Sequence, residues 1–498
     1  MILGNRLGDN ERASAGDTLD DLFRRAGVRH PDAVALADPD NRESFTDGAP
    51  RTLTYAQADR AIAAFAARLR GLGLTTDTVV ALQLPNSVDG IIALLGIMRA
   101  RMIAAPVPLL WRQTETVEAL SRVGAKAVVT ATRIGSVAHG DLAMQVAAEL
   151  FPIRYVCAFG RHLPDGVVPL DDIFGPDAEE AMPAEPRPGA ASAHVAAVTF
   201  DMGVDGLVPV ARSHAELIAG GLAVFQECGA ASDAPLLSAI PPSSFAGMAL
   251  TLVSWLMSGG TLNLHHAFDP QTFATQCRRQ PGGSIVLPGP ALAAIAAAGS
   301  IDDDAKTIAA LWRSPERMAA SATWRGHATL VDVAGFGEIG LVAARRDAHG
   351  LAASIANGNA NGLETTRTAT GLLALRGPMV PTQVFPPGAD NEHEPHLKAD
   401  AAGFVESGFG CQRVGGALAI TGARGGITTV GGYRFRQRDV DAQVAALDPT
   451  ATIIALPDAL LGQKLAGSGA DAATIAARLS TSGANALIAG AFRPRNAA

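Results

Sequence analysis

The sequence predicts an α/β protein with a large main body and at least one smaller unit. Its 498 residues exceed the size of one ordinary domain, so a second unit is expected beside the main body. Apolar residues make up 48% of the chain, which is enough for a sizeable core. Short apolar runs alternate with alanine-rich stretches of helical pattern, and strands separated by helices are typical of parallel sheets.

The apolar runs that predict buried strands recur along the chain at residues 78–84, 126–132, 193–200, 284–287 and 329–334. Helical patterns cover residues 88–100 and 269–279. The uncharged stretch 243–264 is long enough to raise the question of a membrane span, but a Ser-Gly-Gly turn signal at 258–260 interrupts it. We therefore expect a buried helix followed by a buried strand in this stretch, and no membrane partner.

Charge and cysteine usage exclude several classes of protein. The net charge of −8 and the pI near 5.8 provide no basic field, so nucleic acid is not an expected partner. The four cysteines are far apart without a CxxC pair, which indicates free thiols rather than disulfides or a metal site. Residues 1–16 lack the basic start and apolar run of a signal peptide, so a cytoplasmic location is expected.

Short motifs in a fixed order connect the chain to one family. They include Arg51-Thr52-Leu53-Thr54-Tyr55, Leu84-Pro85-Asn86-Ser87, Ser258-Gly259-Gly260-Thr261-Leu262, Phe268-Asp269-Pro270, LLALRGP at 372–378, Ile420-Thr421-Gly422, Gly431-Gly432-Tyr433 and Leu456-Pro457-Asp458. The series spans almost the whole chain and resembles the AMP-binding superfamily of acyl-CoA synthetases, peptide-synthetase adenylation domains and luciferases. The resemblance implies a large N-terminal domain of mixed β-sheets flanked by helices, residues 1–421. It also implies a small mobile α+β C-terminal domain, residues 422–498, with the hinge near 422–426.

Enzymes of this family make an acyl-adenylate from a carboxylate and ATP with magnesium, then pass the acyl group to a thiol. A loop of glycine, hydroxyl residues and lysine surrounds the phosphates, because such donors and cations stabilise their charge. The loop that resembles it here keeps Gly203 and Gly206, but no hydroxyl lies between them and no lysine follows. Asp201 and Asp205 add negative charge, and Arg212 is the one cation nearby. The alternative interpretation is a plain strand-to-helix connection.

Two further nucleotide segments also depart from the family pattern. Where the family has Tyr-Gly-x-Thr-Glu, this chain has Gly335, Phe336, Gly337 and Glu338, so Phe336 is a candidate to stack on a base and Glu338 to approach a metal. Where the family's aspartate holds the ribose hydroxyls, this chain has Phe409, which cannot accept a hydrogen bond. We expect Phe409 to be buried and to fill the ribose space. Residues 335–340 also fit GxGxxG, but a single match without a following long helix is weak evidence for a dinucleotide site.

The remaining candidates concern the acyl group. The resemblance assigns the substrate pocket to Phe245, Ala246, Gly289, Ala334 and Gly335, which we expect to converge on one apolar pocket. At the hinge, Arg424 is displaced by one position from the family's arginine, and it and Glu338 are the weak catalytic candidates. The family's C-terminal Gly-Lys motif is not found before residue 498.

Two hypotheses follow. The favoured one is a family member that has lost ATP-dependent acid activation, needs no cofactor and no metal, and acts as a binding, scaffolding or regulatory protein. The alternative is a divergent acyl- or aryl-CoA synthetase that uses ATP and magnesium through Arg212, Phe336, Glu338 and Arg424. The expected partners are an acyl or aryl carboxylate or acyl-CoA, together with a partner protein.

Overall fold

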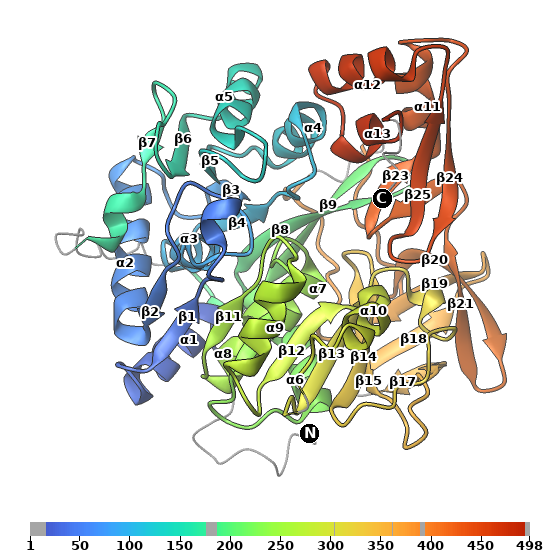
Figure 1. The fold of residues 1–498 in the computed structure, drawn as a ribbon, viewed down its shortest axis with the longest axis horizontal. Coiled ribbons are helices and arrows are strands. Elements are labelled where there is room, and N and C mark those ends of the chain that lie inside the picture. Colours follow the sequence, from blue (N-terminus) through green and yellow to red (C-terminus); the bar gives the residue numbers. More distant parts are fainter. Residues whose placement is uncertain (1–15, 176–186, 303, 361, 389–393, 494–498) are drawn as a thin grey trace.

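The protein forms three large β-sheets with helices packed on them, and a small unit sits over one end of this body (Figure 1). The structure, a computed structural model, describes residues 16–175, 187–302, 304–360, 362–388 and 394–493. The α/β class predicted from the sequence is confirmed. No helix in these ranges is both long enough and apolar enough to cross a membrane.

A seven-stranded sheet is built mainly from the first half of the chain, in the order β7-β6-β5-β3-β4-β8-β9. Its strands are parallel except β9, which pairs with β8 in the opposite direction. The strands are β3 (Val79–Gln83), β4 (Ile103–Pro106), β5 (Ala127–Ala131), β6 (Tyr155–Phe159), β7 (Val168–Pro169), β8 (Val195–Met202) and β9 (Leu207–Ser213). The helices near it are α2 (Tyr55–Gly71), α3 (Val88–Arg99), α4 (Gln113–Val123) and α5 (His139–Glu149).

An eight-stranded sheet follows, in the order β15-β14-β13-β12-β10-β11-β1-β2, with antiparallel strands at its two edges. It contains β1 (Val34–Ala37), β2 (Thr52–Thr54), β10 (Leu236–Ser238), β11 (Leu262–Leu264), β12 (Ser284–Pro288), β13 (Thr307–Trp312), β14 (Thr329–Phe336) and β15 (Gly340–Arg345). Its helices are α1 (Leu19–Arg29), α6 (His214–Cys228), α7 (Phe245–Gly247), α8 (Ser254–Ser258), α9 (Pro270–Arg278) and α10 (Leu292–Ala297). The stretch 243–264 forms α7, a π-helical turn, α8 and β11, mostly buried, as predicted.

The third sheet is antiparallel and six-stranded, and it leads into the small unit. It comprises β16 (Ile355–Ala356), β17 (Gly358–Ala360), β18 (Leu363–Arg367), β19 (Leu372–Arg376), β20 (Val405–Val414) and β21 (Ala417–Ala423). The small unit contains β22 (Ile427–Val430), β23 (Tyr433–Arg436), α11 (Gln437–Ala445), β24 (Thr452–Asp458), β25 (Gly462–Ser468), α12 (Ala472–Thr481) and α13 (Ala486–Gly490) around its own apolar core. Strand β21 runs to Ala423 and β22 begins at Ile427, so the turn 424–426 connects the third sheet to the small unit, and the hinge near 422–426 stays a prediction.

Local signals explain where the helices near the site begin. Ser213 and Glu216 form a capping box at the start of α6, each side chain accepting a hydrogen bond from the other's backbone N–H. Two adjacent glycines allow α6 to pack closely against Phe245 of α7. A Cβ at Gly220 would lie only 2.5 Å from the Phe245 ring. Helix α3 is capped from a distance, since Asp38 accepts from the backbone N–H of Val88 at 2.8 Å.

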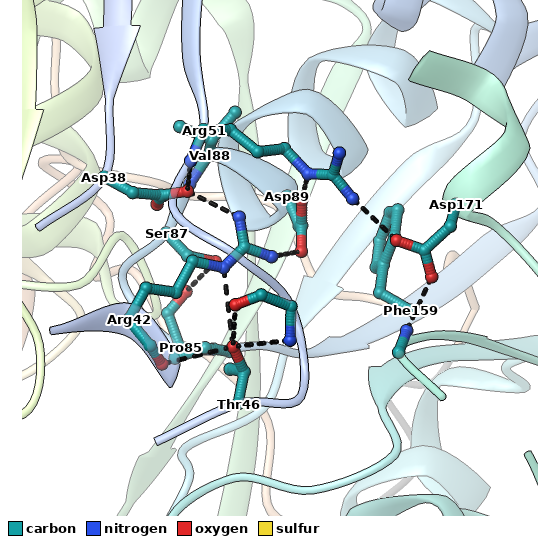
Figure 2. Close-up of polar contacts among 12 residues, drawn as sticks. Asp38, Arg42, Thr46, Arg51, Pro85, Ser87, Val88, Asp89, Phe159 and Asp171 are labelled. Atoms are coloured by element: carbon teal, nitrogen blue, oxygen red, sulfur yellow. Dashed lines mark hydrogen bonds and ion pairs between the residues drawn. The ribbon is translucent and has the colours of Figure 1, made fainter. Parts of the chain in front are cut away.

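A buried network of charges joins the N-terminal segment to α3 (Figure 2). Arg42 donates to Asp38 at 2.5 Å and also to Asp89, and all three side chains are almost fully buried. Arg51 links Asp89, at 3.2 Å, to Asp171, at 2.6 Å. Burial raises the pKa of Asp89 to about 6, although Arg42 opposes this. Each acid in this network therefore depends on an arginine to offset its lost hydration.

We predict that Arg42→Met will lower the free energy of unfolding by about 3–5 kcal/mol, because two buried carboxylates lose their shared partner. Urea denaturation measures this change. The matched control is Arg24→Met, because Arg24 pairs with Asp20 at 3.0 Å from an exposed position. The control should change stability by no more than about 1 kcal/mol. Equal effects of the two substitutions would contradict a structural role for the buried network.

Candidate functional site

A cavity of about 570 Å³ lies between the large body and the small unit, and we call it the interdomain cavity. The elements that line it, including α4, β8, α10 and β23, come together where the small unit meets the body (Figure 1). Its mostly apolar wall includes Trp111, Phe200, Leu311, Tyr433 and Leu461. Ligand sites in proteins are typically concave and apolar with a few polar groups, so this cavity is the candidate site.

The segment that resembles a phosphate loop is the turn of the β8–β9 hairpin. The interpretation as a strand-to-helix connection is therefore wrong, because β9 intervenes before α6 begins at His214. Gly203 and Gly206 bond to each other across the turn, with N–H to O distances of 2.9 and 3.3 Å. The turn needs glycine at Gly206, where φ is +147°. These two backbone N–H groups are occupied within the hairpin.

Asp201, at the end of β8, is held by the small unit. Its carboxylate forms an ion pair with Arg434 at 2.8 Å and accepts from the backbone N–H of Glu338 at 2.9 Å. Gly337 permits this approach, since a Cβ there would lie 2.1 Å from Asp201 Oδ2. Arg436, two residues after Arg434 on β23, donates to the backbone carbonyl of Asp205 at 2.6 Å. The negative charge of Asp201 is thus matched by Arg434, whereas Arg436 contacts the backbone of Asp205 and not its carboxylate.

Glu338 lines the interdomain cavity at the end of β14. Its carboxylate accepts from the backbone N–H of Phe245 at 2.7 Å, which ties β14 to α7. Burial raises the pKa of Glu338, and Arg212 only partly opposes that shift. Among the described residues, no group of three or more His, Cys, Asp or Glu side chains is arranged to hold a metal ion.

Arg212 lies behind the cavity wall rather than in it. It is buried, donates to the carbonyls of Glu338 and of Ile339, the latter at 2.9 Å, and stacks over the Phe245 ring at 3.7 Å. Burial lowers the pKa of Arg212 to about 10. This cation, predicted to lie near phosphates, instead joins the β14–β15 turn to α7.

Phe409 is buried with 1% exposure, as predicted. Its ring packs edge-on against Phe336 with centroids 5.8 Å apart, and the Arg434 guanidinium lies 4.4 Å from its centroid. Phe336 is fully buried beneath it and does not line the cavity. Arg424 is exposed, and its backbone N–H donates to Gly408 at 2.8 Å. The Asp201–Arg434 ion pair and the two phenylalanine rings therefore form one packed unit.

The predicted substrate-pocket residues lie around the cavity but behind its surface. Phe245, Ala246, Ala334 and Gly335 are all buried, and a Cβ at Gly335 would lie 3.9 Å from that of Ala246. Gly289 instead contacts the Trp312 indole, since a Cβ there would lie 2.4 Å from the ring. The surface itself is provided by neighbours of these residues, namely Ser243, Ser244, Pro288, Pro290, Gly337 and Glu338.

Sequence reasoning missed Arg313 and Arg317, which follow β13 and line the interdomain cavity. Arg313 donates to Ser244 Oγ at 3.0 Å, and its stem packs under Gly432, where a Cβ would lie 2.2 Å from Arg313 Cδ. Neither arginine forms an ion pair within the described ranges. Their position directly after a strand could have identified them from the sequence, because ligands of α/β sheets bind beyond the carboxyl ends of strands.

The fold and the site define an adenylate-forming class of protein. A family model described as "AMP-binding enzyme" matches residues 23–344, which is more than half of the chain. The chain belongs to this family, whose members are acyl- and aryl-CoA synthetase-like.

Relatives in this family include ligases of aromatic acids. A salicyl-AMP ligase / salicyl-S-ArCP synthetase of Mycobacterium tuberculosis is 30% identical over 150 residues, covering 29% of this chain and 25% of that protein. A 2-hydroxy-7-methoxy-5-methyl-1-naphthoate–CoA ligase of Streptomyces carzinostaticus is 28% identical over 282 residues, covering 55% of this chain and 48% of that protein. The chain thus matches less than half the length of either relative.

Solved structures share the whole fold at low identity. MbtA of Mycobacterium smegmatis superposes with a TM-score of 0.67 at 22% identity, covering 96% of this chain and 90% of that one. The amide bond synthetase McbA of Marinactinospora thermotolerans superposes with a TM-score of 0.70 at 17% identity, covering 95% and 94%. At these identities, the similarity shows a shared fold only.

We predict that Asp201→Asn and Arg434→Gln will each lower the free energy of unfolding by about 1.5–3 kcal/mol, because each leaves a buried charge without its partner. The double variant should lose less than the sum, with a coupling energy of about 1 kcal/mol or more. Urea denaturation of the four proteins measures it.

The neighbouring pair provides the control. Arg436 donates to the backbone carbonyl of Asp205, so Asp205→Asn and Arg436→Gln should couple by less than about 0.5 kcal/mol. Additive effects of Asp201→Asn and Arg434→Gln would show that the ion pair does not hold the small unit to the hairpin.

Proposed function

We propose that this protein binds an apolar acyl or aryl carboxylate in the interdomain cavity and does not activate it with ATP. The observation that carries the proposal is the Asp201–Arg434 ion pair at the hairpin that resembles the family's phosphate loop. The residues present do not fit a magnesium-bound triphosphate there. The N–H groups of Gly203 and Gly206 are engaged with each other, and Asp201 presents a carboxylate.

Charge explains why the hairpin disfavours a nucleotide. Two like unit charges about 4 Å apart repel by roughly 4 kcal/mol at an effective dielectric of about 20. Arg434 offsets this repulsion while it is paired with Asp201, so a phosphate would have to compete for Arg434 and would then meet the uncompensated carboxylate. The buried rings of Phe336 and Phe409 offer no acceptor for ribose hydroxyls. All three effects oppose the same ligand, so compensation by one neighbour would not suffice.

The carboxylate ligand is supported by the wall of the interdomain cavity. Its aromatic and aliphatic side chains suit an apolar body, and Arg313 and Arg317 are cations suited to a carboxylate. Two relatives are named for salicyl and naphthoate ligation, which makes an aromatic acid the first ligand class to test.

A divergent acyl- or aryl-CoA synthetase is the second candidate. It is favoured by Glu338, which lines the cavity at the end of β14, and by Arg313 and Arg317, which could face phosphates there. Arg212, Phe336 and Arg424 do not support it, because the first two lie behind the wall and Arg424 is exposed on the turn before β22. The two candidates differ in whether ATP takes part.

We expect no ATP–pyrophosphate exchange with salicylate, 1-naphthoate or decanoate, and none after Phe409→Asp, since the other obstacles remain. Calorimetry should detect binding of at least one of these acids with an affinity that ATP–magnesium does not change. Measurable exchange with any of them would establish the synthetase instead.

A variant that fills the cavity locates the binding. Ala294, on α10, lines the interdomain cavity, whereas Ala297 is exposed on the same helix and does not line that cavity. Ala294→Phe should weaken acid binding about tenfold or more, because overfilling a site costs about 1–3 kcal/mol. Ala297→Phe should leave it unchanged. Equal binding by the two variants would place the acid elsewhere.

A further inference from the structure

A second cavity, of about 670 Å³, lies on the opposite side of α10 from the interdomain cavity. We call it the outer cavity. Helix α10 separates the two, because Ala294 and Ile295 line the interdomain cavity while Ala293 and Ala296 line the outer one. Small side chains on both faces of this short helix leave space on each side of it.

The outer cavity has an apolar and aromatic interior. Its apolar wall includes Pro290, Leu292, Ile301, Trp312 and Trp324. The ring N–H of Trp312 donates to Asp332 Oδ1 at 2.7 Å, and that of Trp324 donates to the carbonyl of Ala328 at 2.8 Å. Because both indole N–H groups are already engaged, the rings offer a ligand apolar and π contacts only.

The outer cavity also presents arginines to a ligand. Arg346 also lines it but is neutralised by buried Asp332, at 2.8 Å. Arg317 and Arg325 line it as well, and neither forms an ion pair within the ranges that the structure describes. Asp302 and Glu316 are the acids of the lining. Arg317 and Arg325 are thus the lining arginines that remain available to an anionic group of a ligand.

The small unit reaches both cavities through the turn between β24 and β25. Ala459 lines the outer cavity, and its carbonyl accepts from Arg317 Nη2 at 2.6 Å. Leu460 and Leu461, the next two residues, line the interdomain cavity. Arg317 itself lines both cavities, so a ligand in the outer cavity would contact a residue of the neighbouring site.

We propose that the outer cavity is a second ligand-binding site, which takes an aromatic amphipathic anion. The planar apolar body lies against α10 and the Trp312 and Trp324 rings, and the anionic group faces Arg317 and Arg325. This site shares Arg317 and Pro290 with the interdomain cavity but does not require that cavity to be occupied.

The test uses a probe of this chemistry and its neutral analogue. 8-Anilino-1-naphthalenesulfonate carries an aromatic body and a sulfonate, whereas N-phenyl-1-naphthylamine lacks the anion. Titration of the full chain should show tryptophan-to-probe energy transfer for the sulfonate, with affinity at least about tenfold above that of the neutral probe, as expected for a charge-assisted contact. Equal affinity of the two probes would overturn the anionic class.

Variants on the two faces of α10 assign the signal to a cavity. Because Trp111 lines the interdomain cavity and can sensitise a probe bound there, the comparison starts from Ala294→Phe, which fills that cavity and should keep a tryptophan-sensitised binding event. Adding Ala296→Phe should abolish that event. Loss of the event in Ala294→Phe alone, or its persistence in the double variant, would show that the outer cavity is not an independent site. This measurement is separate from the measurement of acid binding. Either proposal, acid binding in the interdomain cavity or anion binding in the outer cavity, can therefore be contradicted while the other is confirmed.

A surface variant tests the anion partner without disturbing the core. Arg325 is exposed, and Arg325→Gln should weaken the sulfonate about tenfold while leaving the neutral probe unaffected. The matched control is Arg438→Gln, at an exposed arginine of α11 that does not line the outer cavity. If Arg325→Gln and Arg438→Gln behave alike, the assignment of the anion to Arg325 is wrong.

Discussion

The ion pair between Asp201 and Arg434 is the contact on which the arrangement of the site depends. It joins the end of β8 in the body to β23 in the small unit, and the same carboxylate accepts from the backbone of Glu338. Both side chains are largely shielded from water, so separation of the pair would leave unpaired charges in a poorly hydrated place. The small unit is therefore held against the hairpin by internal charge.

That constraint also determines what kind of ligand space remains. With Arg434 over Phe409 and Phe409 against Phe336, the region beside the hairpin is filled by the protein's own side chains. The open space next to it is the interdomain cavity, which Asp201 and Arg434 also line, and the outer cavity lies on the other side of α10. Both linings are mostly apolar and include arginines. This arrangement supports the proposed binding of an apolar acid.

Much of the fold was predictable because a short continuous apolar run in a large α/β protein has few possible structures other than a buried strand. Residues 78–84 and 126–132 are near-continuous apolar segments, and both form buried strands of a parallel sheet. The hairpin at 203–206 was misjudged because strand β9 contains a proline and an arginine, which obscure its pattern. At the site, Phe409 was predicted to be buried because an apolar ring stands where the family has a ribose-binding aspartate, whereas no local signal reveals that Arg212 turns inward.

The sequence alone determined the class of fold, the family, the lack of a hydroxyl side chain between Gly203 and Gly206 and the lack of a lysine after them, because these depend on residue type and order. The tertiary structure decided which charges meet. Asp201 and Arg434 are 233 residues apart in the chain. Arg313 and Arg317 acquire a role only because β13 ends between two cavities. Contacts between distant segments depend on how sheets and units pack, and single-sequence patterns carry information about neighbours along the chain rather than neighbours in space.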